Sequence, residues 1–201
     1  MFKRFHIRAL CLLTASLIFC LKASAQQFSV STNVVDWMAI GTVNAEGGVA
    51  LQRHFSAFAG FRINPWVFRS GNPEDRFEDP LGDEERQFQD KKQAYYAGVR
   101  YWPWYIFSGW WVGMRGQYME YDRGGFIVHE REAGDAWGIG LSGGYSYMLN
   151  ENFNIDFGMG FWGGQTNYGT YRCTNCGQPV ENGKKWFVLP DYIAVSLMYI
   201  F

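Results

Sequence analysis

Cysteine and histidine, the residue types that most often bind metals or form covalent intermediates, are scarce in this sequence. After residue 25 the chain has only two cysteines, Cys173 and Cys176, and two histidines, His54 and His129. A zinc site needs about four ligands, and only His129 could join the two cysteines. A thioredoxin-like redox pair would need a βαβ context, which is absent. We predict a disulfide between Cys173 and Cys176, and zinc binding is the alternative.

A catalytic base would have to be one of these two histidines. His129 lies beside Glu130 and Glu132, with Asp122 nearby in the sequence. No serine is placed next to His129 by the pattern, and a single histidine among acids is typical of a solvated loop. We therefore predict no enzymatic activity, no cofactor and no metal.

The segment 68–92 contains eight acidic and five basic residues. Its spacing does not match a calcium-binding EF-hand loop, which needs alternating oxygen ligands and a Gly at the sixth position. A run of charges is typical of a solvated loop, and this is our interpretation. Divalent-cation bridging to lipopolysaccharide, or a partner-binding surface, are the alternatives.

The first 25 residues have the pattern of a secretory signal peptide. Lys3, Arg4 and Arg8 precede the apolar run 9–21, and Ala23-Ser24-Ala25 forms a small-residue cleavage site. The run has 13 residues, too few for a transmembrane helix, which needs about 20. We predict a signal peptide at 1–25 and a single domain at 26–201. Its 14 Lys+Arg against 19 Asp+Glu argue against a nucleic-acid partner.

After residue 27 the hydrophobic period is two almost everywhere. In the stretch 153–161, large apolar residues occupy every odd position, and small or polar residues occupy every even one. This alternation predicts a β-strand with one apolar face. Eight such segments occur, near 28–38, 43–53, 55–67, 93–103, 109–122, 135–149, 152–170 and 186–201. No capped helix pattern competes with them.

The connections between these segments alternate in length. Short turns near 53–55, 103–108 and 149–152 alternate with longer loops at 68–92, 123–134 and 171–185. This order is typical of an outer-membrane barrel with tight periplasmic turns. Closure is required in lipid because an open sheet edge would leave backbone groups unpaired. We predict an all-β fold, an eight-stranded antiparallel up-and-down transmembrane barrel with a filled polar interior.

The two faces of the predicted strands differ in side-chain size. One face carries Phe, Ile, Val, Leu, Trp and Tyr. The other carries small and polar residues, including Gly60, Gly98, Gly113, Gly138, Gly140, Gly144, Gly158 and Gly160. An eight-stranded barrel has just enough room inside for side chains. We therefore expect the bulky face to meet lipid and the small face to line the interior.

Five charged residues fall on the predicted inner face: Glu46, Arg62, Arg100, Arg115 and Asp156. Buried charges are unfavourable unless they are paired and hydrogen-bonded, so we predict an ionic network inside the barrel. A turn centred on His54 would set Glu46 directly opposite Arg62. Three Arg against two acids leave a surplus positive charge, for Asn33, Gln117, Tyr121 or water to share. A proton or ion path is the functional alternative.

The last segment carries an outward stripe of Ile193, Val195, Leu197, Tyr199 and Phe201. This stripe, ending on an aromatic residue, resembles the terminal signal by which Gram-negative barrels are recognised by their insertion machinery. Aromatic residues also gather at two levels, as expected for interfacial girdles. The predicted girdles are Trp102, Trp104, Tyr105, Phe107, Trp110 and Trp111, and Trp66, Phe68, Tyr118, Trp162, Tyr168 and Trp186.

Several short motifs together resemble one known family. They are Ser31-Thr32-Asn33-Val34-Val35, Asn64-Pro65-Trp66, Arg100-Tyr101-Trp102, Tyr171-Arg172-Cys173-Thr174-Asn175-Cys176-Gly177, Lys184-Lys185-Trp186-Phe187 and the terminal stripe. The chain resembles a family of Bacteroidetes outer-membrane barrels classed as a domain of unknown function. The resemblance implies a fold similar to OmpA-type or OmpX-type barrels, a place in the outer membrane and a link to fimbrial components, but no activity. The longer, more acidic segment 68–92 departs from the family pattern.

These observations predict a non-enzymatic protein of the Gram-negative outer membrane. Its role would be structural or partner-binding, and its partners would be membrane lipid, lipopolysaccharide, the insertion machinery and surface or fimbrial proteins. No small-molecule substrate is evident. A soluble secreted lipocalin-like binding barrel is the first alternative, and a lipid A-modifying barrel enzyme is the second.

Overall fold

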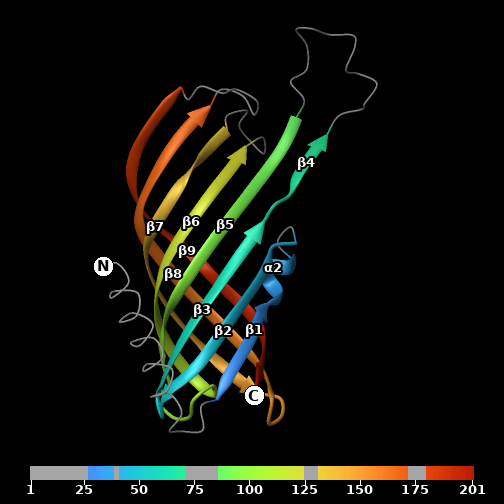
Figure 1. Cartoon of the computed structure of the whole chain (residues 1–201), viewed down its shortest axis with the longest axis vertical. Coiled ribbons are helices and arrows are strands. Elements are labelled where there is room, and N and C mark those ends of the chain that lie inside the picture. Colours follow the sequence, from blue (N-terminus) through green and yellow to red (C-terminus); the bar gives the residue numbers. More distant parts are fainter. Residues whose placement is uncertain (1–26, 39–40, 71–85, 125–130, 172–179) are drawn as a thin grey trace, which may run out of the picture.

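The computed structural model describes residues 27–38, 41–70, 86–124, 131–171 and 180–201. They form one long antiparallel sheet that closes on itself (Figure 1). The strands are β1 (Phe28–Asn33), β2 (Val43–Gln52), β3 (Phe55–Asn64), β4 (Val67–Ser70), β5 (Arg86–Tyr101), β6 (Gly109–Gly124), β7 (Arg131–Met148), β8 (Phe153–Tyr171) and β9 (Glu181–Ile200). A helix of five residues, α2 (Val34–Met38), follows β1. No helix in these ranges is long and apolar enough to span a membrane.

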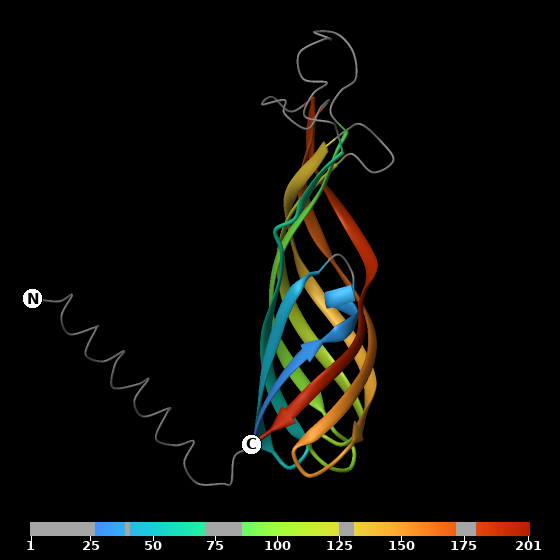
Figure 2. The same ribbon diagram turned by 90° about the vertical axis from the view of Figure 1, so that its right-hand side faces the viewer.

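β3 and β5 stand at the two ends of the strand order β3-β2-β1-β9-β8-β7-β6-β5, and the sheet closes because these two strands pair with each other. β4 continues the line of β3 and also pairs with β5, so β3 and β4 share one place in the wall. Every pairing is antiparallel. The prediction of a closed eight-stranded antiparallel barrel is confirmed, and Figure 2 shows the cylinder from the side.

Two features of the predicted strands were wrong. Residues 34–38, predicted as the end of the first strand, form α2 instead. The strands β5, β7 and β9 begin at Arg86, Arg131 and Glu181, inside the segments predicted as long loops. The reason is that strands β5 to β9 continue upward (Figure 1) into segments where backbone pairing persists but apolar and polar residues no longer alternate.

The lower end, where β9 terminates (Figures 1 and 2), contains a cluster of buried aromatic side chains. Trp102, Phe107 and Trp111 are buried and pack with Met198 in one cluster. Phe107 has a φ of 58° and its carbonyl accepts a hydrogen bond from Asn154 Nδ2 at 2.5 Å. The prediction that Trp102, Phe107, Trp111 and Trp162 stand in outer girdles was wrong, because all four are buried. Trp102 is two residues from Arg100, and Trp111 is four residues from Arg115, so in a strand each Trp shares the face of an Arg predicted to point inward. The alternation therefore indicated that both Trp side chains point inward.

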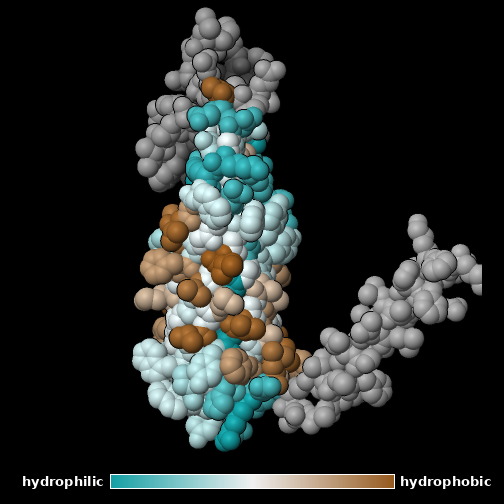
Figure 3. Space-filling view, turned by 90° about the vertical axis from the view of Figure 1, so that its left-hand side faces the viewer, coloured by the Kyte–Doolittle hydropathy of each residue, from teal (hydrophilic) through white to brown (hydrophobic). Residues whose placement is uncertain are grey.

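The outer face carries the large apolar residues of the alternation. Phe157 and Leu197 are each 48% exposed, whereas their neighbours Asp156 and Ser196 are buried. Figure 3 shows apolar side chains gathered around the middle of the cylinder on the face drawn, below a more hydrophilic upper part. The described surface therefore has an apolar belt between two more polar ends.

Candidate functional site

Three arginine side chains lie buried inside the barrel. Arg62, Arg100 and Arg115 are each exposed by 4% or less. Because arginine remains charged under all ordinary conditions, each guanidinium requires nearby acceptors. The barrel interior is therefore a candidate site, because it must supply these acceptors.

Arg100 and Glu46 form an ion pair across the interior. Arg100 Nη2 lies 2.7 Å from Glu46 Oε1, and both side chains are almost fully buried. The guanidinium carbon of Arg100 also stands 4.3 Å from the ring centre of Phe58 and 4.6 Å from that of Trp111. The positive charge is thus held by one carboxylate and two aromatic faces.

Arg62 forms its ion pair with Asp36, a residue that the sequence did not indicate. Arg62 Nε lies 3.1 Å from Asp36 Oδ2, and the two side chains are 5% and 18% exposed. Asp36 sits on α2 and reaches Arg62 because the chain turns at Asn33. It brings the acids near the three buried arginines to three, with Glu46 and Asp156, so the predicted surplus of positive charge disappears.

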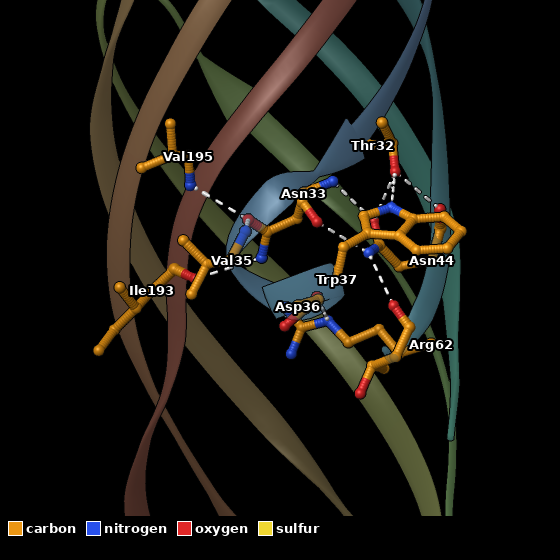
Figure 4. Close-up of polar contacts among 10 residues, drawn as sticks. Thr32, Asn33, Val35, Asp36, Trp37, Asn44, Arg62, Ile193 and Val195 are labelled. Atoms are coloured by element: carbon orange, nitrogen blue, oxygen red, sulfur yellow. Dashed lines mark hydrogen bonds and ion pairs between the residues drawn. The ribbon is translucent and has the colours of Figure 1, made fainter. Parts of the chain in front are cut away.

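A signal for Asp36 was present in the alternation. If the first strand had continued through Met38, Asp36 would have shared a face with Phe28 and Val30, both of which are half exposed. A charged residue on the apolar face of a predicted strand argues against the strand continuing through that residue. The chain instead forms α2, which turns Asp36 inward (Figure 4).

The predicted pairing of Glu46 opposite Arg62 was wrong. Glu46 lies opposite Gly60, and Arg62 lies opposite Asn44. The hairpin pairs Gln52 with Phe55 around a two-residue turn, and a bulge between Ala50 and Gln52 shifts the register again. A turn centred on His54 with no bulge cannot give this register.

Asp156 and Arg115 are also buried in the interior. Trp111 Nε1 donates to Asp156 Oδ1 at 2.6 Å, and Asp156 is only 1% exposed. The guanidinium carbon of Arg115 lies 5.5 Å from the ring centre of Tyr96. All five residues of the predicted ionic network therefore lie inside the barrel, with Glu46 and Arg100 in direct contact.

Asn33 is where the wall changes from strand to helix (Figure 4). Its Oδ1 accepts hydrogen bonds from the backbone N–H of Val35 and of Val195, both at 3.1 Å. Its Nδ2 donates to the carbonyl of Ile193 at 3.2 Å. One side chain thus caps the N-terminus of α2 and continues the pairing to β9 after β1 has ended.

On β2, the side chain of Asn44 bonds the backbone of Asn33 from the other side. Its Oδ1 accepts from the backbone N–H of Asn33 at 2.7 Å, and its Nδ2 donates to the Asn33 carbonyl at 3.0 Å. The indole of Trp37 on α2 donates to Thr32 Oγ1 at 2.8 Å. Side chains therefore replace backbone pairing on both sides of Asn33, and we call this group, Thr32, Asn33, Trp37 and Asn44, the seam.

Asn33→Ala should weaken the barrel at the seam. The substitution leaves the backbone groups of Val195 and Ile193 without the asparagine that now bonds them, at a cost of roughly 1–3 kcal/mol. The measurement is the temperature at which the purified protein in detergent converts from its folded to its unfolded gel mobility. The exposed Asn182 on β9 supplies the control, because Asn182→Ala should leave this temperature unchanged. Equal temperatures for both variants would contradict the role of the seam.

The upper ends of β6, β7, β8 and β9 carry a second group of charges. Glu132 Oε1 accepts from Tyr121 Oη at 3.0 Å and lies 3.3 Å from Lys185 Nζ. Partial burial raises the pKa of Glu132, but Tyr121, Arg123 and Lys185 together lower it by more, so the net pKa lies below its ordinary value. This carboxylate therefore remains ionised at neutral pH. Its contacts with Tyr121 and Lys185 connect three strands, β6, β7 and β9.

Two further acids of this upper region are held by neighbours. Arg131 binds Asp122 with two hydrogen bonds of 2.6 Å, and the bond to Asp122 raises the pKa of Arg131. Asp135 accepts from Asn167 Nδ2 at 2.8 Å. The cross-strand ties rigidify the part of the sheet that stands above the apolar belt.

The remaining residues that the sequence indicated lie partly outside the described ranges. Cys173, Cys176, His129 and most of the acids of 68–92 lie outside the described residues. His54 lies in the β2–β3 turn, with Nδ1 2.8 Å from the Trp102 carbonyl oxygen. Within the described ranges, no group of three His, Cys, Asp or Glu side chains is arranged to hold a metal ion. In the terminal stripe, Ile193, Leu197 and Phe201 are exposed, and Val195 and Tyr199 are partly exposed.

Comparison with known proteins gives a family and no activity. No curated protein and no solved structure matches the chain significantly. One family model, DUF3575, described as a protein of unknown function, matches residues 10–201. Since this match covers nearly the whole sequence, the chain belongs to the DUF3575 family.

Proposed function

We propose that this protein is a non-enzymatic β-barrel of a Gram-negative outer membrane, with a structural or partner-binding role at the cell envelope. The observation that carries the proposal is the distribution of side chains across the wall. Large apolar residues point outward and three arginines with their acids point inward. A soluble barrel would have the opposite arrangement.

The apolar belt is too continuous for a water-exposed monomer. Ile139, Leu141, Met159 and Phe161, on the neighbouring strands β7 and β8, are all more than half exposed. Soluble monomers rarely expose contiguous apolar patches larger than a few hundred Å². Covering apolar surface is favourable by about 25 cal/mol per Å². Lipid acyl chains would provide this cover on every side of the barrel at once.

The backbone also fits a bilayer. A transmembrane β-strand needs about 9–11 residues when tilted, and β2, β3 and β5 to β9 have between 10 and 20 residues each. The sheet is closed where β1 pairs with β9 and β3 with β5, so the backbone groups there are bonded within the wall.

The direction of the barrel follows from its connections. The described turns at the lower end are short, and β5 to β9 extend upward beyond the belt (Figure 1). Short turns face the periplasm in outer-membrane barrels, so the upper end would face outward. In this arrangement lipopolysaccharide surrounds the upper belt, and the outward stripe from Ile193 to Phe201 contacts the insertion machinery during assembly. The disulfide Cys173–Cys176 and the signal peptide 1–25 belong to the same proposal.

The proposed role is to stabilise the envelope or to hold a surface partner, such as a fimbrial component, at the upper end. The aromatic cluster of Trp102, Phe107 and Trp111 fills the lower end of the barrel. This filling favours a structural or binding role over transport through the interior.

Cell fractionation tests the proposal. We expect the protein in the outer-membrane fraction, with a folded form that migrates differently on gels before and after boiling. A protein that stays soluble without detergent would instead support the lipocalin-like binder and refute the membrane proposal. For the lipid A enzyme, a change in lipid A mass that is lost in His129→Ala would be required, and unchanged lipid A in a deletion strain eliminates it.

A further inference from the structure

We propose that the upper edge of β9, residues Glu181–Leu189, binds an extended strand of a protein partner. Hereafter this segment is called the β9 edge. The inference rests on the proposed function only in placing the edge on the outside of the cell. Its physical basis is the pairing of the strands, which holds whether or not the barrel lies in a membrane.

The β9 edge is paired on one side only by the strands that the structure describes. β8 pairs with β9 over its whole length, up to Thr170 opposite Glu181. β1 covers only the lower part of β9, from Ser196 to Ile200. On the far side of the gap, β4 has β5 as its one partner among the described strands. Among the described strands, the wall above the seam therefore has two edges where a complete barrel has none, and Figure 1 shows β9 rising beyond the end of β1.

The lower part of the gap is already covered. The Asn33 side chain bonds the backbone of Ile193 and Val195, and α2 packs beside β9 (Figure 4). Pro190 lies at the bulge of β9 and has no N–H to donate. The segment open to a new strand thus ends below at Leu189 and above at Glu181.

An unpaired edge carries a row of N–H and C=O groups that can pair with another strand. Here the edge also carries large apolar side chains, since Trp186 is 76% and Val188 77% exposed. Both lie on the outer face, together with Lys184. A partner strand would satisfy the backbone groups and cover these two side chains in the same step.

A second copy of this chain is a poor occupant. Antiparallel pairing of two β9 edges over their full length would place Lys185 directly opposite Lys185 of the other copy. Like charges directly opposite each other destabilise a strand pair. Lysines on edges are a common device against self-association. In this register the edge is therefore better suited to a different chain than to a second copy.

The outer face of the β9 edge also predicts the chemistry of the partner. A strand running antiparallel to β9 would meet Val188, Trp186 and Lys184 in that order. Complementary residues would be apolar, apolar and acidic, each separated by one residue. Lys184 is exposed, so it is available to an acidic side chain.

Peptide titration of the purified mature protein in detergent micelles tests this inference. The probe is a synthetic nine-residue peptide with Val opposite Val188 and Trp186 and Asp opposite Lys184. We expect the amides of Glu181–Leu189 that point away from β8 to exchange with solvent at least tenfold more slowly when the peptide is bound. The same peptide N-methylated at alternate residues, which cannot pair, should give no protection.

Two variants make the result specific. Lys184→Glu should reverse the preference between the Asp peptide and a Lys peptide of the same length. Replacing Trp186 by a photo-crosslinking phenylalanine should capture the peptide, whereas the same replacement at Trp137 should not. Trp137 and Trp186 occupy the same cross-strand row, through Gln165, but Trp137 lies on β7, which is paired on both sides.

Several outcomes would overturn the inference. They are unchanged exchange at saturating peptide, equal protection by the N-methylated peptide, and capture of a second copy of this chain or of lipid at position 186. Each is distinguishable from failure of the proposed function, because that is decided by fractionation of the cells and not by peptide binding.

Discussion

Asp36→Asn should destabilise the barrel by about 3 kcal/mol, because it removes a carboxylate that faces a buried guanidinium. Arg62 is almost completely buried and lies 3.1 Å from Asp36. Its charge cannot be neutralised by deprotonation. The measurement is unfolding of the purified protein in urea and detergent, followed by gel mobility or tryptophan fluorescence.

The double variant separates the ion pair from other roles of α2. In Asp36→Asn with Arg62→Met, no arginine charge remains to be compensated at this site, so most of the lost stability should return. Glu151→Gln, at an exposed position in the β7–β8 turn, should have no measurable effect. If Asp36→Asn unfolded at the same urea concentration as the unchanged protein, the structural importance of this pair would be refuted.

Gly138→Ala should have a comparable or larger effect through packing. A Cβ at this position would overlap the backbone carbonyl oxygen of Gly163 and lie 2.9 Å from the Cα of Gly164. Gly138 and Gly164 are directly opposite each other on β7 and β8. The obstruction is backbone in a paired strand, so it cannot rotate away. We expect a loss of about 3 kcal/mol, the upper end of ordinary overpacking costs, or failure to reach the folded form.

Gly116→Ala supplies the matched control for this prediction. Gly116 also lies mid-strand, on β6 opposite Ile139, but nothing stands within 4 Å of a Cβ built there. The substitution should leave the folded fraction and the unfolding midpoint unchanged or slightly raised. The two variants are compared by the yield of the heat-modifiable folded band. Similar yields for both would show that the narrow approach of β7 and β8 is not what requires glycine.

Much of the fold follows from local sequence patterns. The alternation in 153–161 predicted β8 and the outward direction of Phe157, because successive side chains of a strand point to opposite faces. The same rule brought Arg62, Arg100, Arg115 and Asp156 to the buried side. Such predictions depend only on whether a residue occupies an odd or an even position along one strand.

The candidate site was predicted less completely. The partners of Arg62 and Arg100 depend on register, which the bulge at Ala50–Gln52 and the two-residue turn at 53–54 decide. The contribution of Asp36 depends on a helix of one turn that has no periodic signal of its own. The upper cluster around Glu132 lies where the alternation ends and pairing alone maintains the strands.

The amino-acid sequence by itself thus determined the eight strands, their antiparallel order and the face on which most strand residues lie, because these follow from a period of two and from turn lengths. Only the tertiary structure decided which charges meet, where the wall is closed by side chains of Asn33 and Asn44, and which edge of β9 is left unpaired by the described strands. The physical reason is that register and edges are properties of pairs of strands. If one strand shifts by two residues relative to its neighbour, every side chain keeps its face of the sheet, but every residue is paired with a new partner.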